Sequence, residues 1–527
     1  MDNSAEYYLN TACEKLPVVK RAVHECGDIS LWEYLKKFVC NASSAYQPMD
    51  DFLDVIYRYA SRLLGKSTAR QAVRDLEACP AALTSNHLGI EYFSQSLQSI
   101  ILFSLNRFTH GASSATVPVF SFGNVPLNNL TYPRGALLYH ISGELDDMPL
   151  NIPVFPDRFK RCTACAAPAF DRDMLGRAEA QVNKMLGRRQ ISHAIADTMH
   201  RIFKEDYGAA QVLSLPDYSS QCTVVNSRIW KRLFSEPAAA PELIYLEIEK
   251  IAAMLLSADM VNHGSLARCV MFDPMLRHAV LERLDGAVGC WSLEKLYRHM
   301  ETNVPDDREK KHSAGWGTVF FWGLDDAGKK IPLCPEPDGS HTQMLHGKDD
   351  HGRYFGLPYT PESIADFLHK KKIIPSLFTC FLTLSFARGI ACIGGYFQGE
   401  YLPHMQHGLA DSLEKNGYSN AVQSVLQVPA DFYLSGVLAV MAASGDHCLI
   451  PAGPAEIIAG RGISPEDIGQ MHSLTVRDAH IAGLSETVPD AAAQELLGPG
   501  WKKNLAADCF RVLTGKIPVK QMLSDTE

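Results

Sequence analysis

Residues 81–122 place the strongest constraint on what this chain can fold into. The apolar run at 81–83 is followed by the polar turn TSNHLG at 84–89, and apolar residues then recur with helical spacing from residue 90 to residue 108. Residues 116–122 have the composition of a second strand. Strand, turn, helix and strand in this order predict two parallel strands joined by a crossover helix, which is the unit of an α/β sheet.

The turn at 84–89 is the first candidate for part of an active site. In open α/β sheets, ligands bind beyond the carboxyl ends of the strands, where helix N-termini present N–H groups. We expect Ser85 and Asn86 to lie at the N-cap of the helix. The candidate site residues of this turn are Thr84, Ser85, Asn86, His87 and Gly89.

His87 is the candidate catalyst of this turn. Imidazole can transfer a proton or stabilise developing negative charge near neutral pH. The alternative is a core histidine that is hydrogen-bonded to backbone. The position of His87 before Gly89, where a strand leads into a helix, favours the catalytic interpretation.

A second polar segment, residues 123–135, follows the second strand and is rich in turn residues and carboxamides. We expect Asn124 and Asn128 to orient a polar substrate, and Arg134 to pair with an anionic group of it. An equally open alternative is a connecting loop whose Asn side chains cap their own backbone.

Residues 389–407 contain the third group of candidates. A short buried strand at 389–393 precedes Gly394 and Gly395, and paired glycines let the backbone approach a ligand closely. Glu400, His404 and His407 share one helical face at i, i+4 and i+7. Glu400 is the candidate carboxylate base and His404 a candidate substrate-binding residue, whereas an exposed ion-pairing face is the alternative.

Composition and charge argue against several classes of protein. The 527 residues are 46% hydrophobic and 21% charged, as in ordinary folded proteins. A net charge of -9 and a pI near 6.1 give no field that favours nucleic acid. The apolar runs are too short for the roughly 18–20 residues of a membrane span, and no signal-peptide pattern occurs. With fourteen dispersed cysteines, these features predict a cytoplasmic protein with free thiols and no membrane partner.

Two groups of residues have the composition of metal ligands. Cys162 and Cys165 form a C-x-x-C pair, but no second pair follows at zinc-site spacing. His341, His346 and residues 349–351 crowd a polar loop, where solvated histidines are the commoner interpretation. We therefore predict no metal site.

The pattern along the chain predicts an α/β fold with a Rossmann-like parallel sheet. The helical pattern around 171–205 recurs at 242–260, a hairpin is expected at 315–333, and Thr360 is expected to cap a helix. The predicted regions are a helical N-terminal region at 1–78, the first half of the Rossmann-like core at 79–156, a helical insertion at 157–302, the second half of the α/β core at 303–450 and a C-terminal helical cap at 451–527.

Several windows together resemble the cysteine-adding enzyme family of bacillithiol biosynthesis. The turn at 84–89 resembles the family's T-G-x-Q-P-G turn, residues 118–121 its P-V-F-W strand, and residues 393–401 its I-G-G-P-G-E-x-x-Y segment. The family's strand continues into an acidic E-D-H-D stretch, where this chain has residues 123–128. The resemblance implies a Rossmann-type core with a long helical insertion, and ligase chemistry that joins cysteine to a glucosamine–malate conjugate.

Three hypotheses about function follow. The first is an enzyme that forms C–N bonds, as a ligase or transferase, on a polar amino-containing metabolite, with His87 as acid or base and Glu400 as carboxylate base. The second is a nucleotidyl transferase that uses ATP or another nucleotide as cofactor. The third is a non-catalytic binding protein. The expected partner is a small-molecule substrate, and a homodimer is an open alternative to a monomer.

Overall fold

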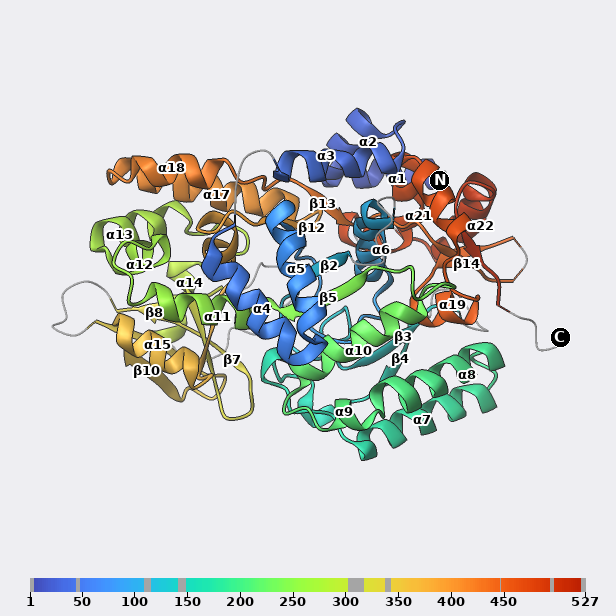
Figure 1. Cartoon of the computed structure of the whole chain (residues 1–527), viewed down its shortest axis with the longest axis horizontal. Coiled ribbons are helices and arrows are strands. Elements are labelled where there is room, and N and C mark those ends of the chain that lie inside the picture. The colour runs from blue at the N-terminus through green and yellow to red at the C-terminus, as the bar shows by residue number, and fades with distance from the viewer. Residues whose placement is uncertain are drawn as a thin grey trace.

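The computed structural model describes residues 4–43, 48–108, 115–140, 148–301, 317–336, 343–445, 447–492 and 497–522. At its centre lies a five-stranded sheet with the strand order β13-β12-β1-β2-β5 (Figure 1). All neighbouring pairs in this sheet are parallel. The strands are β1 (Ala81–Leu83), β2 (Thr116–Ser121), β5 (Glu242–Glu247), β12 (Ala391–Gly395) and β13 (Tyr433–Ser435). The protein is therefore a mixed α/β protein built on a parallel sheet.

The crossover predicted for residues 81–122 is confirmed in its topology. β1 and β2 are parallel neighbours with Leu83 paired to Val119, and helix α6 (Ser94–Phe108) connects them. The strand predicted before the paired glycines is β12, which pairs in parallel with the other side of β1. Segments about three hundred residues apart in the chain, such as Leu83 and its partner Ile393, therefore lie side by side.

The helical prediction for residues 242–260 is wrong in its first part. Residues 242–247 form β5, which pairs along its whole length with β2, and helix α11 (Ile248–Asp259) follows directly. Five of the six residues of β5 are buried. A strand that is covered on both faces lacks the apolar–polar alternation that identifies a half-exposed strand. The region 157–302 thus supplies an edge strand of the central sheet.

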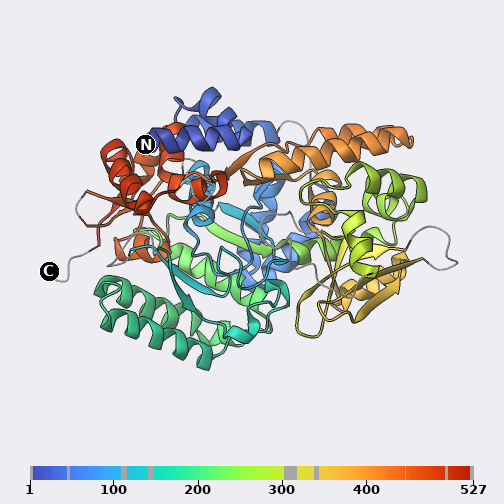
Figure 2. The same ribbon diagram turned by 180° about the vertical axis from the view of Figure 1, so that it is seen from behind.

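Two hydrophobic cores cover the two faces of the sheet, because side chains alternate along each strand. On β2, Val117 and Val119 face the core shared with α6 and α10 (Tyr218–Arg232), whereas Phe120 faces the core shared with α4, α5 and α11. Helices α4 (Asp50–Leu64) and α5 (Lys66–Ala78) cross in front of the sheet in Figure 1, and Figure 2 shows the molecule from the opposite side.

The N-terminal region is helical as predicted. Besides α4 and α5 it contains α1 (Ala5–Lys15), α2 (Pro17–Cys26) and α3 (Leu31–Ser43). Only part of this region packs on the sheet, since α1 and α2 contact the C-terminal helix α21 (Val476–Ala491) instead. The two ends of the described chain therefore pack together (Figure 1).

The region 157–302 is otherwise helical. Its further helices are α7 (Arg172–Gly187), α8 (His193–Arg201), α9 (Ala210–Leu213), α12 (Leu266–Phe272), α13 (Pro274–Arg283) and α14 (Leu293–Glu301). α7 and α8 pack against each other at the edge of the molecule, where α7 contacts β4 (Figures 1 and 2). A short hairpin of β3 (Gly135–Leu138) and β4 (Leu150–Pro153) precedes this region. No helix in the described ranges is long and apolar enough to cross a bilayer.

The hairpin predicted at 315–333 is present as β6 (Phe321–Leu324) and β7 (Lys330–Pro332), which pair antiparallel. With β11 (Ile373–Pro375) they form a three-stranded sheet next to a second small sheet. That second sheet consists of β8 (Cys334–Pro335), β9 (Met344–Lys348) and β10 (Tyr354–Pro358). Thr360 caps α15 (Pro361–His369) through its hydroxyl, as predicted. The proposed boundary at 303 lies outside the described residues.

Apart from β12 and β13, the remainder of the chain, from residue 376 to residue 522, combines helices with one small sheet. Its helices are α16 (Leu377–Phe381), α17 (Gln398–Lys415), α18 (Ser419–Leu426), α19 (Pro454–Ala459), α20 (Pro465–Ser473), α21 and α22 (Trp501–Leu513). A small sheet of β14 (Met441–Ala443), β15 (Leu449–Pro451) and β16 (Val519–Lys520) packs among them. The last strand to join that sheet comes from the end of the described chain, so the terminal residues close this layer.

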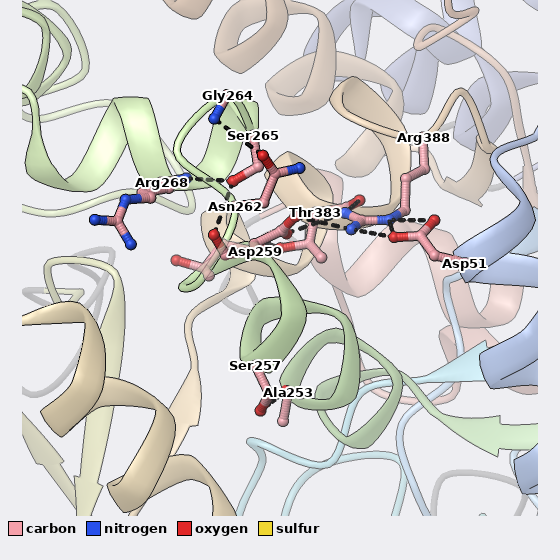
Figure 3. Close-up of polar contacts among 11 residues, drawn as sticks. Asp51, Ala253, Ser257, Asp259, Asn262, Gly264, Ser265, Arg268, Thr383 and Arg388 are labelled. Atoms are coloured by element: carbon pink, nitrogen blue, oxygen red, sulfur yellow. Dashed lines mark hydrogen bonds and ion pairs between the residues drawn. The ribbon is translucent and has the colours of Figure 1, made fainter.

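Arg388 fixes the chain just before β12 (Figure 3). Arg388 is 2% exposed, and its guanidinium donates to Asp51 of α4 at 2.7 Å and to Asp259 of α11 at 2.9 Å. It also donates to the carbonyl of Thr383 at 3.1 Å. A buried guanidinium shared between two carboxylates joins three segments that are far apart in sequence. This cluster anchors the amino end of β12, at the sheet edge opposite the strand carboxyl ends.

Candidate functional site

A cavity of about 420 Å³ lies at the carboxyl ends of four strands of the central sheet. Thr84 and Ser85 follow β1, Phe122 follows β2, and Gly395 and Ser435 end β12 and β13. This is the edge at which parallel α/β sheets bind their ligands. Of the sequence candidates, the cavity is lined by Thr84, Ser85, His87, Asn124 and Gly395. Three segments that are distant in sequence thus meet at one site.

His87 is held in one tautomer at the rim of the cavity. Its Nδ1 lies 3.0 Å from Oδ1 of Asn129 and 3.1 Å from the hydroxyl of Thr131. The same Oδ1 accepts the backbone N–H of Thr131 at 3.2 Å, which identifies this atom of the carboxamide as the oxygen. Because that oxygen only accepts, Nδ1 of His87 carries the proton and Nε2 has the free lone pair.

The ring of His87 is neutral. Burial lowers its pKa from 6.5 to about 4, opposed by the hydrogen bond to Asn129 and assisted by the nearby Lys330 ammonium. Its Nε2 makes no hydrogen bond to any residue that the structure describes. The backbone of His87 is held by β5, because the hydroxyl of Tyr245 on that strand donates to the carbonyl of His87 at 2.8 Å. Nε2 is therefore a positioned acceptor for a proton from the cavity contents.

The turn at 84–89 does not lead directly into a helix, so the predicted N-cap is wrong. The chain first continues alongside β2, with Phe122 donating to the carbonyl of Asn86 and Leu88 donating to the carbonyl of Phe122, both at 2.8 Å. Helix α6 begins only at Ser94. A stretch of about ten residues between β1 and α6 is thus held as a rigid loop over the sheet edge.

Asn86 and Gly89, both candidates from sequence, shape this loop and do not line the cavity. Asn86 is fully buried, and its Nδ2 donates to Glu91 at 2.7 Å. Glu91 also accepts from Ser96, and burial raises its pKa to about 7. A side chain at Gly89 would meet the Cα of Pro133 at 2.9 Å, so this position requires glycine.

The loop after β2 divides into a part that faces the cavity and a part that does not. Glu249 of α11 accepts the backbone N–H of Gly123 at 2.8 Å and of Asn124 at 3.0 Å, which sets the start of the loop. Asn124, Asn129 and Thr131 line the cavity. Asn129 caps its own loop backbone, as one of the two alternatives for this loop predicts, and it also contacts His87.

Asn128 and Arg134 do not line the cavity. Asn128 is exposed and points away, whereas its neighbour Asn129 contacts His87. Arg134 is 6% exposed and donates to the carbonyl of Phe155 at 2.7 Å and to Asp157. Arg134 therefore fixes the β3–β4 region, and its guanidinium is already occupied.

Gly394 shapes β12 without lining the cavity itself. The Gln398 side chain folds back over this glycine, and a Cβ there would lie 2.2 Å from Cδ of Gln398. In this position Gln398 donates to the hydroxyl of Thr84 at 2.8 Å and to the carbonyl of Cys392 at 3.1 Å. Gln398 lines the cavity and joins α17 to β1.

Glu400 and His404 lie outside the cavity, which corrects their assignment to the site. Both are exposed on α17. Glu400 instead lines a surface groove with residues of α2 and accepts the backbone N–H of Val18 at 3.4 Å. One helical face can hold these two side chains together, but the N-terminal turn of α17 directs Gln398 to the sheet edge and Glu400 away from it.

The sequence prediction missed an acidic corner of the cavity, formed by Gln95, Tyr396 and Asp490. The Tyr396 hydroxyl donates to Asp490 of α21, whose pKa is raised by burial. Gln95, at the start of α6, is 8% exposed, and its Nε2 is buried. Contact with the side chain of Gln95 opposes the rise in the pKa of Tyr396 that burial causes, so the Tyr396 hydroxyl is an acceptor for this amide.

The remaining walls are aromatic and uncharged. Phe93, Phe122, Phe397 and Tyr401 line the cavity together with hydroxyls and carboxamides. Phe397 is half-exposed at the rim, with 51% of its surface accessible. Among the described residues that line the cavity, none is Lys or Arg. Amides, hydroxyls and aromatic faces suit a small polar ligand with little negative charge.

Residues considered as metal ligands do not cluster in the described ranges, where no group of three or more His, Cys, Asp or Glu residues is suitably placed. Cys162 and Cys165 are thiols against the β6–β7 hairpin, with Gly328 packed on the Sγ of Cys162. His341 lies outside the described residues.

No family model matches this sequence, and no curated protein and no solved structure matches it either.

Proposed function

We propose that the protein is an enzyme of small-molecule metabolism that forms a C–N bond on a polar amino-containing metabolite bound in this cavity. The observation that carries the proposal is an imidazole nitrogen without a protein partner at the rim of the cavity. Nε2 of His87 makes no hydrogen bond to any described residue, while Asn129 holds the other ring nitrogen. The side chains of Gln95 and Tyr396 lie together in another corner of the same cavity.

In the proposed reaction His87 acts as the general base. The amine nitrogen of one reactant attacks an electrophilic carbon of the other, so that an N–C bond forms and the bond from carbon to its leaving group breaks. The proton lost by the attacking amine passes to Nε2 of His87, whose Nδ1–H remains bonded to Asn129. Gln95 and Asn124 orient the reactants through their carboxamides.

The resemblance of short sequence segments to a ligase family supports the choice of reaction class. Two segments resemble parts of the cysteine-adding enzyme family, and both lie at the ends of neighbouring strands. Residues 84–89 follow β1, and residues 393–401 include the end of β12. We propose on this basis that the sheet is a Rossmann-like core, and that the free thiols belong to a cytoplasmic protein. A described lining without Lys or Arg favours this reaction over nucleotidyl transfer, because triphosphates are bound largely by Lys, Arg or a metal ion.

A second candidate, a non-catalytic binding protein, is favoured by the position of Glu400. The carboxylate expected to assist His87 faces another groove, and the carboxylate in the cavity, Asp490, is already bonded to Tyr396. In this alternative the same lining residues hold a ligand, and His87 accepts a hydrogen bond without transferring a proton.

The test has two stages. A thermal-shift screen against amino acids, amino sugars, acyl donors and nucleotides identifies ligands, since a compound that binds only the folded state raises the melting temperature. Pairs of stabilising compounds are then incubated with the wild type, with His87→Ala and with His404→Ala, and new C–N products are sought by mass spectrometry. We expect product with the wild type and with His404→Ala, and none with His87→Ala.

The melting temperature of His87→Ala separates the alternatives. A nearly unchanged value with lost turnover supports catalysis. A collapse of folding indicates a core histidine, and ligand binding without product in every pair supports the binding protein.

A further inference from the structure

A second cavity, of about 410 Å³, lies at the carboxyl end of β5, on the same edge of the sheet as the first. Glu247, the last residue of β5, lines it together with Lys250, Ala253 and Ser257 of α11. Figure 3 shows Ala253 and Ser257 on successive turns of α11, at some distance from the Arg388 cluster. The opposite wall comes from β11 and the end of α15, so this cavity lies between the central sheet and the smaller sheet.

The two cavities share a wall. Glu249 lines the second cavity while its carboxylate accepts the N–H groups of Gly123 and Asn124 at 2.8 Å and 3.0 Å. Asn124 in turn lines the first cavity. Glu249 therefore has a positioning role, and its hydrogen-bonding capacity is largely used by backbone.

Glu247 is a buried carboxylate whose charge no nearby described residue neutralises by direct contact. It is 6% exposed and lines the cavity, yet it has no ion pair with any described residue. Ser219 supplies a hydrogen bond, which serves only one of the several acceptor sites of a carboxylate. A buried carboxylate without a cation in contact is costly.

The nearby lysines are committed to another carboxylate. Asp217 lies 3.3 Å from Nζ of Lys371 and 4.0 Å from Nζ of Lys250. Lys250 also rests over the ring of Tyr59, with 4.9 Å between its Nζ and the ring centroid. Lys250 therefore moderates the charge of Glu247 from a distance without bonding to it.

The body of the cavity is apolar. Away from Glu247 its walls are Met254, Leu324, Leu368, Ile374 and Pro375. A ligand that fits this arrangement has one cationic hydrogen-bond donor and a short apolar chain that can pack against aliphatic side chains and the thioether of Met254.

We propose that this second cavity binds a small primary amine, whose ammonium group donates to Glu247 and whose apolar body packs against Met254 and Leu368. The site stands independently of the reaction proposed for the first cavity. A primary ammonium supplies the cation that Glu247 lacks, and one of its N–H groups can donate to the Glu247 oxygen not used by Ser219.

The experiment measures binding of butylammonium to the full chain by calorimetric titration near neutral pH, with butanol and butyrate as matched compounds. We expect millimolar binding of butylammonium only. Glu247→Gln should weaken it at least tenfold, and Ser257→Phe, which fills the cavity without changing charge, should abolish it. Glu400→Gln, an exposed carboxylate in a different groove, should leave it unchanged.

Unchanged binding in Glu247→Gln or in Ser257→Phe, equal binding of butyrate or butanol, or no binding of the amine overturns the proposal. If Glu247→Gln fails to fold, Ser257→Phe decides the matter alone. His87→Ala should not affect amine binding here, so failure of this proposal and failure of the proposed function give different results.

Discussion

Nδ1 of His87 lies 3.0 Å from Oδ1 of Asn129, and this contact fixes which nitrogen of the imidazole faces the cavity as a base. Asn129 is itself locked by the backbone N–H of Thr131. The catalytic interpretation of His87 thus depends on a residue that follows it in the chain after one helix, α6, and one strand, β2. The neighbour of this residue, Asn128, is exposed.

Asn129→Asp should raise the pKa of His87 from about 4 toward or above its usual value. A carboxylate next to Nδ1 stabilises the imidazolium, whereas the amide oxygen does so only weakly. The pKa is measured by NMR titration of the imidazole. Asn128→Asp is the matched control and should leave it unchanged, and an equal shift in both variants would mean that the His87–Asn129 contact is absent.

Arg388→Met should destabilise the protein by about 3–5 kcal/mol, because it leaves Asp259 buried without its cation. Lys370→Met, which removes an exposed pair with Asp366 at 2.7 Å, should cost less than about 1 kcal/mol. Urea denaturation compares the two variants. Similar small losses for both would show that the Arg388 cluster does not hold the amino end of β12.

Two glycine-to-alanine substitutions should have opposite signs. Gly176 is an exposed position inside α7 with no atom near the added methyl group, so Gly176→Ala should stabilise by about 0.5–1 kcal/mol. At Gly135 the added Cβ would lie 2.0 Å from the carbonyl oxygen of Ile152, so Gly135→Ala should destabilise by about 1–3 kcal/mol. Melting temperatures test both, and a stabilising Gly135→Ala would contradict the β3–β4 pairing.

Stability should fall as the pH is lowered from about 6.5 to about 4, in part because of His480. Burial lowers the pKa of His480 to about 4, and its ring accepts from Tyr433 at 2.8 Å and donates to the carbonyl of Val476 at 2.7 Å. The unfolded chain takes up the proton first, near pH 6.5, so protonation favours unfolding across this window.

His480→Asn should make the loss of stability across this window smaller, although the variant is less stable at neutral pH. Urea midpoints between about pH 4 and pH 7 measure the slope. His404→Ala, on the exposed face of α17, is the control. A slope that does not change in His480→Asn would contradict the buried neutral ring.

Local signals in the sequence sufficed for much of the fold. Thr360 caps its helix through its hydroxyl, as its position before a proline and an acidic first turn predicted. The pairing of β1 with β2 also followed from a local strand, helix and strand pattern. β5 was missed because burial on both faces removes the alternation that marks a strand.

The site was predictable only where it lies next to recognisable strand ends. His87 and Asn124 follow β1 and β2 directly, so their types and places in sequence pointed to the cavity. Gln95 and Asp490 carried no such signal, because Asp490 reaches the site from α21 through tertiary packing alone. The prediction that Glu400 lies in the site was wrong, because helical spacing gives the relative positions of side chains on α17 but not which side of the helix faces the sheet.

The most direct test of the account is the imidazole nitrogen NMR spectrum of His87 at neutral pH, recorded with and without a compound that raises the melting temperature. The account predicts a neutral ring protonated on Nδ1, with an Nε2 signal that shifts when the compound binds. A charged ring, a proton on Nε2 instead of Nδ1, or an Nε2 signal that no stabilising compound moves would contradict it.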